Sequence, residues 1–429
     1  MFNSDRLLIH NIGQLVTNSP LYTNQTWGSV LEQDLGCLSQ AWVAFERGRI
    51  AMIGTGDRPS HLNTWPRWNA EGKLVVPGLV DCHTHLLFAG DRSDEFLRRL
   101  RGETYQDIAK TGGGILSTVR ATRSASDKDL IDLLRLRLDL ALQQGITTLE
   151  IKTGYGLTIP EELRQLRLIQ TANKDVHQTL VSTCLALHGI PPEFRSARDY
   201  VDAVVKELLP QIARDHLAEY CDIFIEEGYF NVSDGDRYAQ AAKSLGLGLR
   251  VHADEFTDAG AAAFAARWHA ASADHLQMAN PSSFSSLAEA GVVCTLLPGT
   301  SLYCKIPFTQ AEPFRNAGCA VAIASDFNPG SCRFRHLATL AALAAIHNGL
   351  TLPEALAGIT IVAAKSLGLQ NRKGHLTPGA DADLMILPYR SFAEWFADLA
   401  QQPPTQVWCG GCLLVSLGND EVSPNSGFP

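Results

Sequence analysis

Residues 75–85 read Val-Val-Pro-Gly-Leu-Val-Asp-Cys-His-Thr-His, an apolar run that ends in two histidines separated by one residue. We predict a buried strand over Leu79–His83 with a polar end. Alternate side chains of a strand point to the same side, so His83 and His85 are expected close enough to share one metal ion. Neutral imidazole is a good ligand for zinc or iron. A His-x-His pair also arises by chance, with one of the two histidines simply solvated.

Seven more apolar runs of strand length follow along the chain, and helical patterns separate several of them. The eight expected strands cover Leu79–His83, Thr147–Lys152, Thr179–Leu185, Ile223–Glu227, Arg250–Ala253, Ser272–His275, Val292–Leu296 and Val321–Ala324. The expected helices cover Lys128–Gln143, Pro160–Asn173, Ala259–Arg267, Ser283–Ala290, Ala338–His347 and Pro353–Ser366. This α/β alternation over about 260 residues matches a TIM-like (β/α)8 barrel in strand count and size. A doubly wound sheet alternates too, but no glycine-rich dinucleotide fingerprint follows the first strand.

Both ends of the chain carry short strands that pair in hairpins. Trp42–Phe45 and Arg49–Ile53 flank a Glu-Arg-Gly hairpin signal, and Asp383–Leu387 precedes a second hairpin over Trp408–Val415. Because chain termini commonly lie close together, we expect a small β-sandwich-like domain built from both ends. The expected boundaries are residues 1–74 and 375–429 for this small domain and residues 75–374 for the barrel.

The cysteines point to a reducing compartment. Cys409-Gly-Gly-Cys412 has the spacing of a redox motif, but no second cysteine pair or helix start accompanies it. We therefore interpret it as a glycine turn between the strands Gln406–Trp408 and Leu413–Ser416. The ten cysteines are scattered through 429 residues, which fits free thiols in the cytosol. The first residues do not read as a signal peptide, so we expect a cytoplasmic location.

Composition and charge restrict the class of partner. Hydrophobic residues make up 45% and charged residues 19% of the chain, as in an ordinary globular protein. No apolar run approaches the roughly 20 residues of a membrane-spanning helix. The 36 basic and 45 acidic residues give a net charge of -9, which disfavours nucleic acid or an anionic membrane as the main partner. An anionic small molecule would need a local positive site.

Polar residues also end three later strands. His252 ends Arg250–Ala253, His275 ends Ser272–His275, and Asp326 follows the last expected strand. These residues meet His83 and His85 only if the strands share one barrel rim, which is where barrel enzymes place their catalytic groups. The alternative is that each residue is a helix cap or a core histidine without a shared function. This explanation would have to hold independently at four strand ends.

These segments resemble the amidohydrolase superfamily, and the likeness is strongest to its imidazolonepropionases, from about Leu74 to Leu387. The segments that carry it are residues 77–85, 111–120, 150–157, 252–255 and 325–331. The first and last are typical of the whole superfamily. The glycine-rich Thr111–Ile115, the segment around Tyr155, and Asn328-Pro-Gly are more specific to the imidazolonepropionases.

The resemblance implies a metal-dependent hydrolase of histidine breakdown that opens the lactam C–N bond of 4-imidazolone-5-propanoate. It implies one zinc or iron ion per chain, an anionic small-molecule substrate and, from the habit of the family, a homodimer. The implied metal ligands are His83, His85, His252 and Asp326. The implied pocket residues are Arg92, Tyr105, Tyr155, His188 and Glu255. The residues implied to contact the ring-opened product are Asn328, Gly330 and Ser331.

Three residues are candidates for the chemistry itself. Glu255 lies three residues beyond His252, in the loop past a strand, where it is placed to take a proton from metal-activated water. His275 is a candidate for orienting the water or stabilising the developing oxyanion. Asp326 is an expected ligand that competes with Glu255 for protonation of the leaving nitrogen, and the sequence leaves these two open.

Three pocket residues also have plain structural alternatives. Arg92 would bind the propanoate through two parallel hydrogen bonds, or it forms a surface ion pair with Asp91 or Asp94. Tyr155, between two glycines, either approaches the ligand or packs within its own loop. His188 either lines the pocket or pairs with the backbone.

Two features depart from the simplest version of this resemblance. Residues 300–307 differ from the more aromatic segment usual in the family, and we expect a changed loop that does not touch the metal ligands. Lys152 ends an expected strand, and some superfamily members bridge two metals with a carboxylated lysine. That lysine belongs to the strand that corresponds to Thr179–Leu185, which ends without one, so we expect one metal.

Two rival functions remain. Another amidohydrolase, such as a heterocyclic-base deaminase or a cyclic-ureide hydrolase, would keep the metal ligands and lose the partners Arg92 and Tyr155. A catalytically inactive barrel that serves as a binding module would have lost ligands. All four ligand positions and Glu255 are present in this chain.

Overall fold

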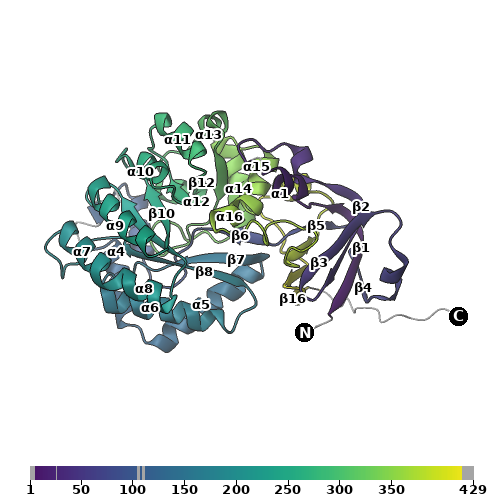
Figure 1. Ribbon diagram of the computed structural model, residues 1–429, viewed down its shortest axis with the longest axis horizontal. Coiled ribbons are helices and arrows are strands. Elements are labelled where there is room, and N and C mark those ends of the chain that lie inside the picture. The colour runs from purple at the N-terminus through teal and green to yellow at the C-terminus, as the bar shows by residue number, and fades with distance from the viewer. Residues whose placement is uncertain (1–4, 26, 104–106, 109–111, 418–429) are drawn as a thin grey trace.

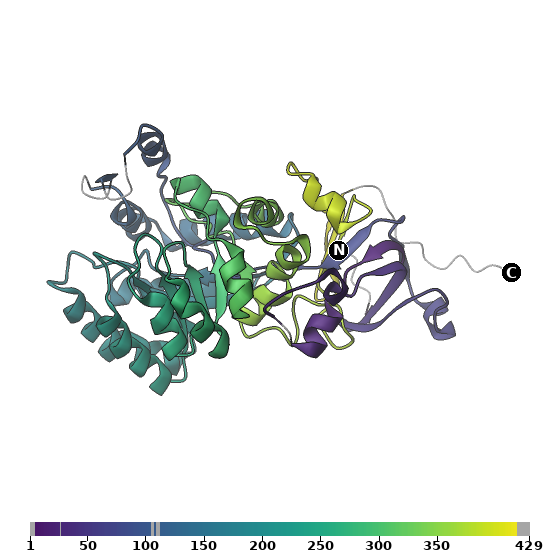
Figure 2. The same cartoon turned by 90° about the horizontal axis from the view of Figure 1, so that it is seen from above.

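The computed structural model describes residues 5–25, 27–103, 107–108 and 112–417. Two parts stand side by side, a round α/β part and a flatter β part that contains strands from both ends of the chain (Figure 1). Figure 2 shows the same division from above. Among the described residues, no helix combines the length and apolar character that a membrane crossing requires.

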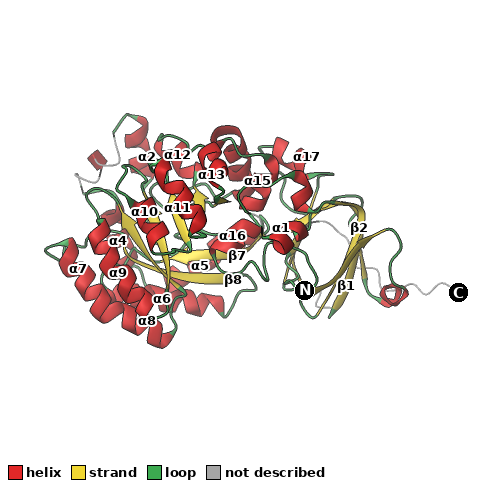
Figure 3. Ribbon diagram, turned by 45° about the horizontal axis from the view of Figure 1, so that its top comes forward, coloured by secondary structure: helices red, strands yellow, loops and turns green. Residues whose placement is uncertain are grey.

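Eight parallel strands form the sheet of the larger part, and they follow one another in chain order. They are β6 (Leu79–Asp81), β7 (Ile146–Lys152), β8 (Thr179–Leu187), β9 (Tyr220–Ile225), β10 (Gly248–Ala253), β11 (Ser272–His275), β12 (Val293–Leu296) and β13 (Ala320–Ile323). Every strand that the sequence predicted is present, and the predicted TIM-like barrel is confirmed. Figure 3 shows these strands enclosed by helices.

The barrel closes just beyond the ends of its first and last strands. Thr84 and Phe327 form a parallel bridge there. The N–H of Asp326 donates to the carbonyl of His83 at 3.0 Å, and the N–H of His85 donates to the carbonyl of Phe327 at 3.0 Å. This seam therefore places two histidines and a carboxylate next to one another through the backbone alone.

Helices cover the outside of the barrel. They are α2 (Ser93–Leu100), α4 (Ile115–Ser124), α5 (Asp127–Leu142), α6 (Ile159–Asn173), α7 (Ala197–Ala203), α8 (Leu209–Asp215), α9 (Val232–Ser244), α10 (Ala261–Arg267), α11 (Phe284–Glu289), α12 (Pro298–Cys304), α13 (Ala311–Ala317), α14 (Leu337–Leu343), α15 (Leu352–Gly358) and α16 (Ile361–Ser366). The predicted single helix Pro353–Ser366 is wrong, because the carbonyl of Ile359 accepts the N–H of Val80 and the chain breaks into α15 and α16. Of these helices, α2, α4, α7, α8, α9, α12 and α13 were not predicted from the sequence.

The smaller part is a mixed sheet of eight strands in the order β16-β15-β14-β5-β1-β2-β3, with β4 paired to β1. Its strands are β1 (Arg6–Leu15), β2 (Leu38–Glu46), β3 (Arg49–Thr55), β4 (Arg67–Asn69), β5 (Leu74–Pro77), β14 (Leu384–Leu387), β15 (Gln406–Cys409) and β16 (Cys412–Ser416). The pairing of β5 with β14 joins the two ends of the chain, as predicted. Cys409 and Cys412 face each other across a turn in which Gly410 and Gly411 have positive φ, which confirms the glycine turn.

Helix α5 shows how a leucine-rich segment packs against the barrel. The Ser126 side chain caps the helix by accepting the N–H of Asp129. Leu130, Leu134 and Leu138 recur every four residues and are fully buried. They form the apolar side of the helix.

We expect Leu138→Ala to lower the free energy of unfolding by about 2–5 kcal/mol, because it removes fully buried methyl groups and leaves a cavity. Leu136→Ala is the matched control, since Leu136 lies two residues away in the same helix and is 55% exposed. Its effect should stay within about 0.5 kcal/mol. Urea unfolding followed by circular dichroism measures both, and equal losses would contradict this packing.

Candidate active site

Three histidines and one aspartate converge at the carboxyl ends of the barrel strands. The ring centroids of His83 and His252 lie 4.6 Å apart, those of His83 and His85 5.3 Å, and those of His85 and His252 5.5 Å. Oδ1 of Asp326 lies 3.5 Å from Nε2 of both His83 and His85. All four side chains are buried. The structure thus brings together the four residues that the sequence proposed as metal ligands.

The donor atoms of this cluster fit a metal ion. Nδ1 of His83 lies 2.7 Å from Oδ2 of Asp274, and Nδ1 of His252 lies 3.1 Å from Oδ2 of Asp222. The Nε2 atoms of His83 and His252 are buried and make no hydrogen bond within the described part of the chain. Burial lowers the pKa of His83 well below its ordinary value, so the imidazole is neutral and carries a lone pair. A carboxylate on Nδ1 that leaves Nε2 free is the usual arrangement of a metal-binding histidine.

Asp326 is held from the far side by a residue of the segment 300–307, which the sequence had not connected with the ligands. Thr300, in α12, donates its hydroxyl to Oδ2 of Asp326 at 2.5 Å. The expectation that residues 300–307 leave the ligand set untouched is therefore wrong. Pro298 starts helix α12 directly after β12, and this turn directs Thr300, the third residue of the helix, toward the rim of the barrel.

The pocket above the cluster contains most of the predicted site residues. Its lining consists of His85, Arg92, Ile115, Tyr155, His188, Phe224, His252, Glu255, Phe256, His275, Asp326, Asn328 and Ser331. Ile115, Phe224 and Phe256 were not predicted as pocket residues; Ile115 ends the glycine-rich segment of the resemblance, whereas no motif marks Phe224 or Phe256. Tyr105 lies outside the described residues.

Glu255 and His275 face each other across this pocket, with Oε2 and Nε2 3.7 Å apart. Burial raises the pKa of Glu255 well above its ordinary value, and the nearby Asp326 carboxylate adds to this effect. Burial lowers the pKa of His275 to about 3, so its ring is neutral near pH 7. Two strand ends here have left-handed backbone, with φ of 81° at His275 and 49° at Asp326. Such conformations cluster at functional sites because the surrounding fold must hold them.

Carboxylates that the sequence did not single out hold the loop of Glu255. Glu226, after β9, accepts the N–H of Phe256 at 2.9 Å. Asp254 accepts the N–H groups of Ala261 and Ala262 at 3.0 and 2.9 Å, at the start of α10. Both anchors are carboxylates in loops, whose partners depend on tertiary contacts that no local spacing reveals.

Arg92 is buried in the pocket wall, and the alternative of a surface ion pair is wrong. Its partner is Glu95, with NH2 and Oε2 2.7 Å apart, whereas Asp91 pairs with Arg333. The other oxygen of Glu95 accepts the N–H of Gly114 at 2.9 Å, which ties the glycine-rich segment to the same wall. Glu95 therefore fixes the guanidinium of Arg92.

The loop of Asn328 packs directly against this guanidinium. The Asn328 side chain accepts the N–H groups of Gly330 and Ser331 at 2.8 and 2.7 Å, which folds the loop back on itself. A Cβ atom at Gly330 would lie 2.0 Å from NH1 of Arg92, so any larger residue there would displace the guanidinium. Gly330 therefore lies behind Arg92, whereas Asn328 and Ser331 reach the pocket.

Tyr155 and His188 form the opposite wall. His188 stacks on His85 with ring centroids 5.1 Å apart, and its Nδ1 lies 3.2 Å from the carbonyl of Gly154. His188 thus lines the pocket and pairs with the backbone at once. Glu162 holds the Tyr155 loop by accepting the N–H of Leu157 at 2.7 Å and that of Gly156 at 2.8 Å.

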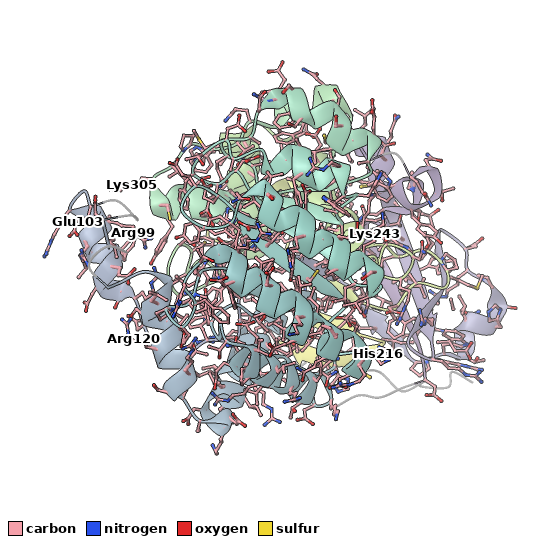
Figure 4. All side chains as sticks on the ribbon, turned by 60° about the vertical axis from the view of Figure 1, so that its left-hand side comes forward. Arg99, Glu103, Arg120, His216, Lys243 and Lys305 are labelled. Carbon is pink, nitrogen blue, oxygen red and sulfur yellow. The ribbon has the colours of Figure 1, made fainter. Side chains whose placement is uncertain are left out.

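A wider cavity meets the pocket at Phe256, which lines both. Its lining includes Arg99, Glu103 and Lys305, which lie at one edge of the molecule (Figure 4). Arg99 donates to the carbonyl of Gly330 at 2.7 Å. Helix α2 is therefore bonded to the loop that supports Arg92.

Comparisons with known proteins agree with this architecture. A sequence model of the amidohydrolase family matches residues 100–415. The imidazolonepropionase of Symbiobacterium thermophilum is 44% identical over 389 residues, which cover 89% of this chain and 90% of that protein. The imidazolonepropionase of Myxococcus xanthus is 43% identical over 391 residues, with coverages of 90% and 91%.

Solved structures share the fold at low sequence identity. A triazine hydrolase variant superposes with a TM-score of 0.75 at 17% identity, covering 96% of this chain and 95% of that one. An adenosine deaminase from Xanthomonas campestris with bound zinc has a TM-score of 0.71 at 18% identity, with coverages of 97% and 94%. The chain belongs to the amidohydrolase family, whose members are metal-dependent. Within this family it is a member of the imidazolonepropionases.

We expect Thr300→Val to weaken metal binding by about 10–100-fold, because Oδ2 of Asp326 loses its hydrogen bond while the side-chain volume is kept. Thr300→Ser retains the hydroxyl and should bind metal nearly as the wild type does. Competition with a chromogenic chelator measures both affinities. Equal affinity of the valine variant and the wild type would show that Thr300 does not support Asp326.

Proposed function

We propose that this chain is a hydrolase that opens the lactam C–N bond of 4-imidazolone-5-propanoate and gives N-formimidoyl-L-glutamate. The observation that carries the proposal is a buried arginine, Arg92, in the same pocket as the histidine cluster. An arginine in that position suits a ring substrate with a carboxylate tail. The two imidazolonepropionases compared above, 44% and 43% identical over about nine-tenths of the chain, support the same assignment.

We infer one zinc or iron ion per chain, held by His83, His85, His252 and Asp326. A metal ion there would lower the pKa of a water molecule to about 7 and polarise the ring carbonyl. Lys152 supports a single ion, because its ammonium pairs with Asp222 at 2.7 Å. A lysine that bridges two metals must instead be neutral before it is carboxylated.

Glu255 is the proposed proton carrier. The water oxygen forms a bond to the carbonyl carbon of the ring, and a proton of that water passes to the Glu255 carboxylate. The bond from this carbon to the ring nitrogen then breaks, and Glu255 returns the proton to the nitrogen. Both oxygens of Asp326 face other partners, Thr300 on one side and the histidines on the other, which favours Glu255 for this last step.

His275 is the proposed stabiliser of the oxyanion. Its neutral ring carries one N–H, and a neutral donor in a buried pocket stabilises the negative charge that develops on the carbonyl oxygen. Tyr155 and His188 pack beside His85 and against each other, and would contact the ring of the substrate from that wall of the pocket. Asn328 and Ser331 lie next to Arg92 and would contact the product.

We further propose a cytoplasmic location, a homodimer and a division into two domains. The ten cysteines are all free thiols, which suits the cytoplasm. A homodimer follows the expectation from the family. The proposed domain boundaries are residues 1–74 and 375–429 for the small domain and residues 75–374 for the barrel, with β5 at the junction because it pairs with β14.

We expect the purified protein to contain about one zinc or iron per chain and to consume fresh 4-imidazolone-5-propanoate, followed by its ultraviolet absorbance. Arg92→Ala should lower kcat/KM by roughly 10–100-fold, mainly through KM, because the substrate carboxylate loses a charged hydrogen-bond partner. Arg135→Ala is the control, since Arg135 pairs with Asp175 on the exposed side of α5. If the protein binds metal but does not turn over this ring, the substrate assignment is wrong and only the assignment to the amidohydrolase family stands.

Gly330→Ala should reproduce the effect of Arg92→Ala without touching Arg92 in the sequence. The new methyl group would occupy the position of the guanidinium, and the arginine is flexible enough to move away while the fold is kept. We expect a raised KM, an unchanged metal content and a wild-type circular dichroism spectrum. A KM equal to that of the wild type would mean that the guanidinium does not need this position.

A further inference from the structure

Lys152, the last residue of β7, lies within a buried group of charged side chains next to the histidine cluster. Its Nζ is 2.7 Å from Oδ2 of Asp222, 3.0 Å from Oε1 of Glu150 and 3.5 Å from Oδ2 of Asp274. All four side chains are fully inaccessible to solvent. The proposed proton transfers involve none of these four side chains, although Asp274 and Asp222 lie beside the ligands His83 and His252.

Two of these carboxylates also hold the histidines. Oδ2 of Asp222, the oxygen that Lys152 contacts, lies 3.1 Å from Nδ1 of His252. Oδ2 of Asp274 lies 2.7 Å from Nδ1 of His83. A single ammonium group therefore contacts both of the oxygens that orient these two imidazole rings.

The backbone of Lys152 reaches the cluster by a second route. Its N–H donates to the carbonyl of Thr84 at 2.9 Å, and Thr84 lies between His83 and His85. The hydroxyl of Thr84 in turn donates to the carbonyl of Glu150 at 2.5 Å. Strand β7 thus holds the two histidines of the first strand end as well as the two carboxylates.

We propose that Lys152 is a positioning residue of the metal centre, whose ammonium fixes Asp222 and Asp274 so that Nε2 of His83 and Nε2 of His252 point toward one metal ion. The inference deepens the proposed metal-dependent hydrolysis and rests on it for the presence of the metal. In this proposal Lys152 orients the residues behind the ligands and does not bind the metal itself.

The other cation of the group, Arg250, shares the contact with Asp274, since NH2 of Arg250 also lies 3.5 Å from Oδ2 of that residue. Arg250 further lies 2.8 Å from Glu150 and donates to the carbonyls of Cys82 and Ser366 at 2.8 and 2.7 Å. The contact that distinguishes Lys152 is the one with Asp222. Among the described residues, Lys152 is the lysine or arginine that pairs with Asp222. Removal of its charge would leave Asp222 without the partner that fixes its orientation. Burial acts to lower the pKa of Lys152, but Asp222 and Glu150 outweigh it and raise the pKa, so the charge is kept.

If Lys152 only neutralised buried carboxylates, its loss would lower stability without changing metal binding. Lys373 provides the comparison, because it is 5% exposed and pairs with Asp383 at 2.7 Å and Asp381 at 2.9 Å, next to β14. Loss of either lysine costs stability in the same way. Only the loss of Lys152 should change metal binding.

The experiment compares Lys152→Met and Lys373→Met with the wild-type chain, without any substrate. Zinc affinity is measured by chelator competition, and the ligand geometry is followed by the visible spectrum of the cobalt-substituted protein. We expect Lys152→Met to bind zinc about 10–100-fold more weakly, with an altered cobalt spectrum. Lys373→Met should match the wild type in both. If Lys152→Met does not fold, Lys152→Gln, which keeps hydrogen bonding without charge, is measured in its place.

The sign of the change is informative. Loss of a nearby positive charge would by itself strengthen the binding of a cation. Weaker zinc binding by Lys152→Met therefore indicates that Lys152 orients the ligands. A zinc affinity equal to or above that of the wild type would overturn the proposal. An equal loss in Lys373→Met would also overturn it. Because zinc binding is measured without substrate, failure of the wild type to open the imidazolone ring would count against the proposed function alone.

Discussion

The backbone seam between the first and last strands of the barrel is the constraint on which the site depends. Two N–H groups cross it, from Asp326 to His83 and from His85 to Phe327. These two hydrogen bonds fix the relative positions of residues more than 240 positions apart, without any side-chain interaction. The histidine of β10 joins them because all eight strands are parallel and end at the same rim.

Burial at this rim determines the electrostatics. Three carboxylates and two cations share the space next to the histidines, and each is matched by a partner because an unpaired buried charge is costly. The loops that carry the reactive residues follow the same rule with backbone partners. Glu95, Glu162, Glu226 and Asp254 each accept N–H groups from a loop of the pocket. The pocket is therefore shaped by buried carboxylates rather than by apolar packing alone.

The sequence was enough to predict the barrel and the residues at its strand ends, because both depend on local patterns, and the family resemblance chose the four proposed ligands among them. Apolar runs mark strands, and His83, His85, His252 and Asp326 each stand directly at or after one. The anchors Glu162, Glu226 and Thr300 were missed because nothing in their local spacing distinguishes them from surface residues. The break between α15 and α16 was missed for a related reason, since the carbonyl that ends α15 is taken by Val80, more than 270 residues earlier.

The two sides of the pocket differ in what holds them. The ligands stand on strands of the barrel, whereas Arg92 depends on Glu95, on the loop of Gly330 and on α2. Residues 298–304 connect the two sides, because Thr300 reaches Asp326 while Tyr303 packs against Phe96 and Arg99 of α2. In a family that keeps its metal chemistry while its substrates differ, the residues on the Arg92 side of the pocket are the freest to vary.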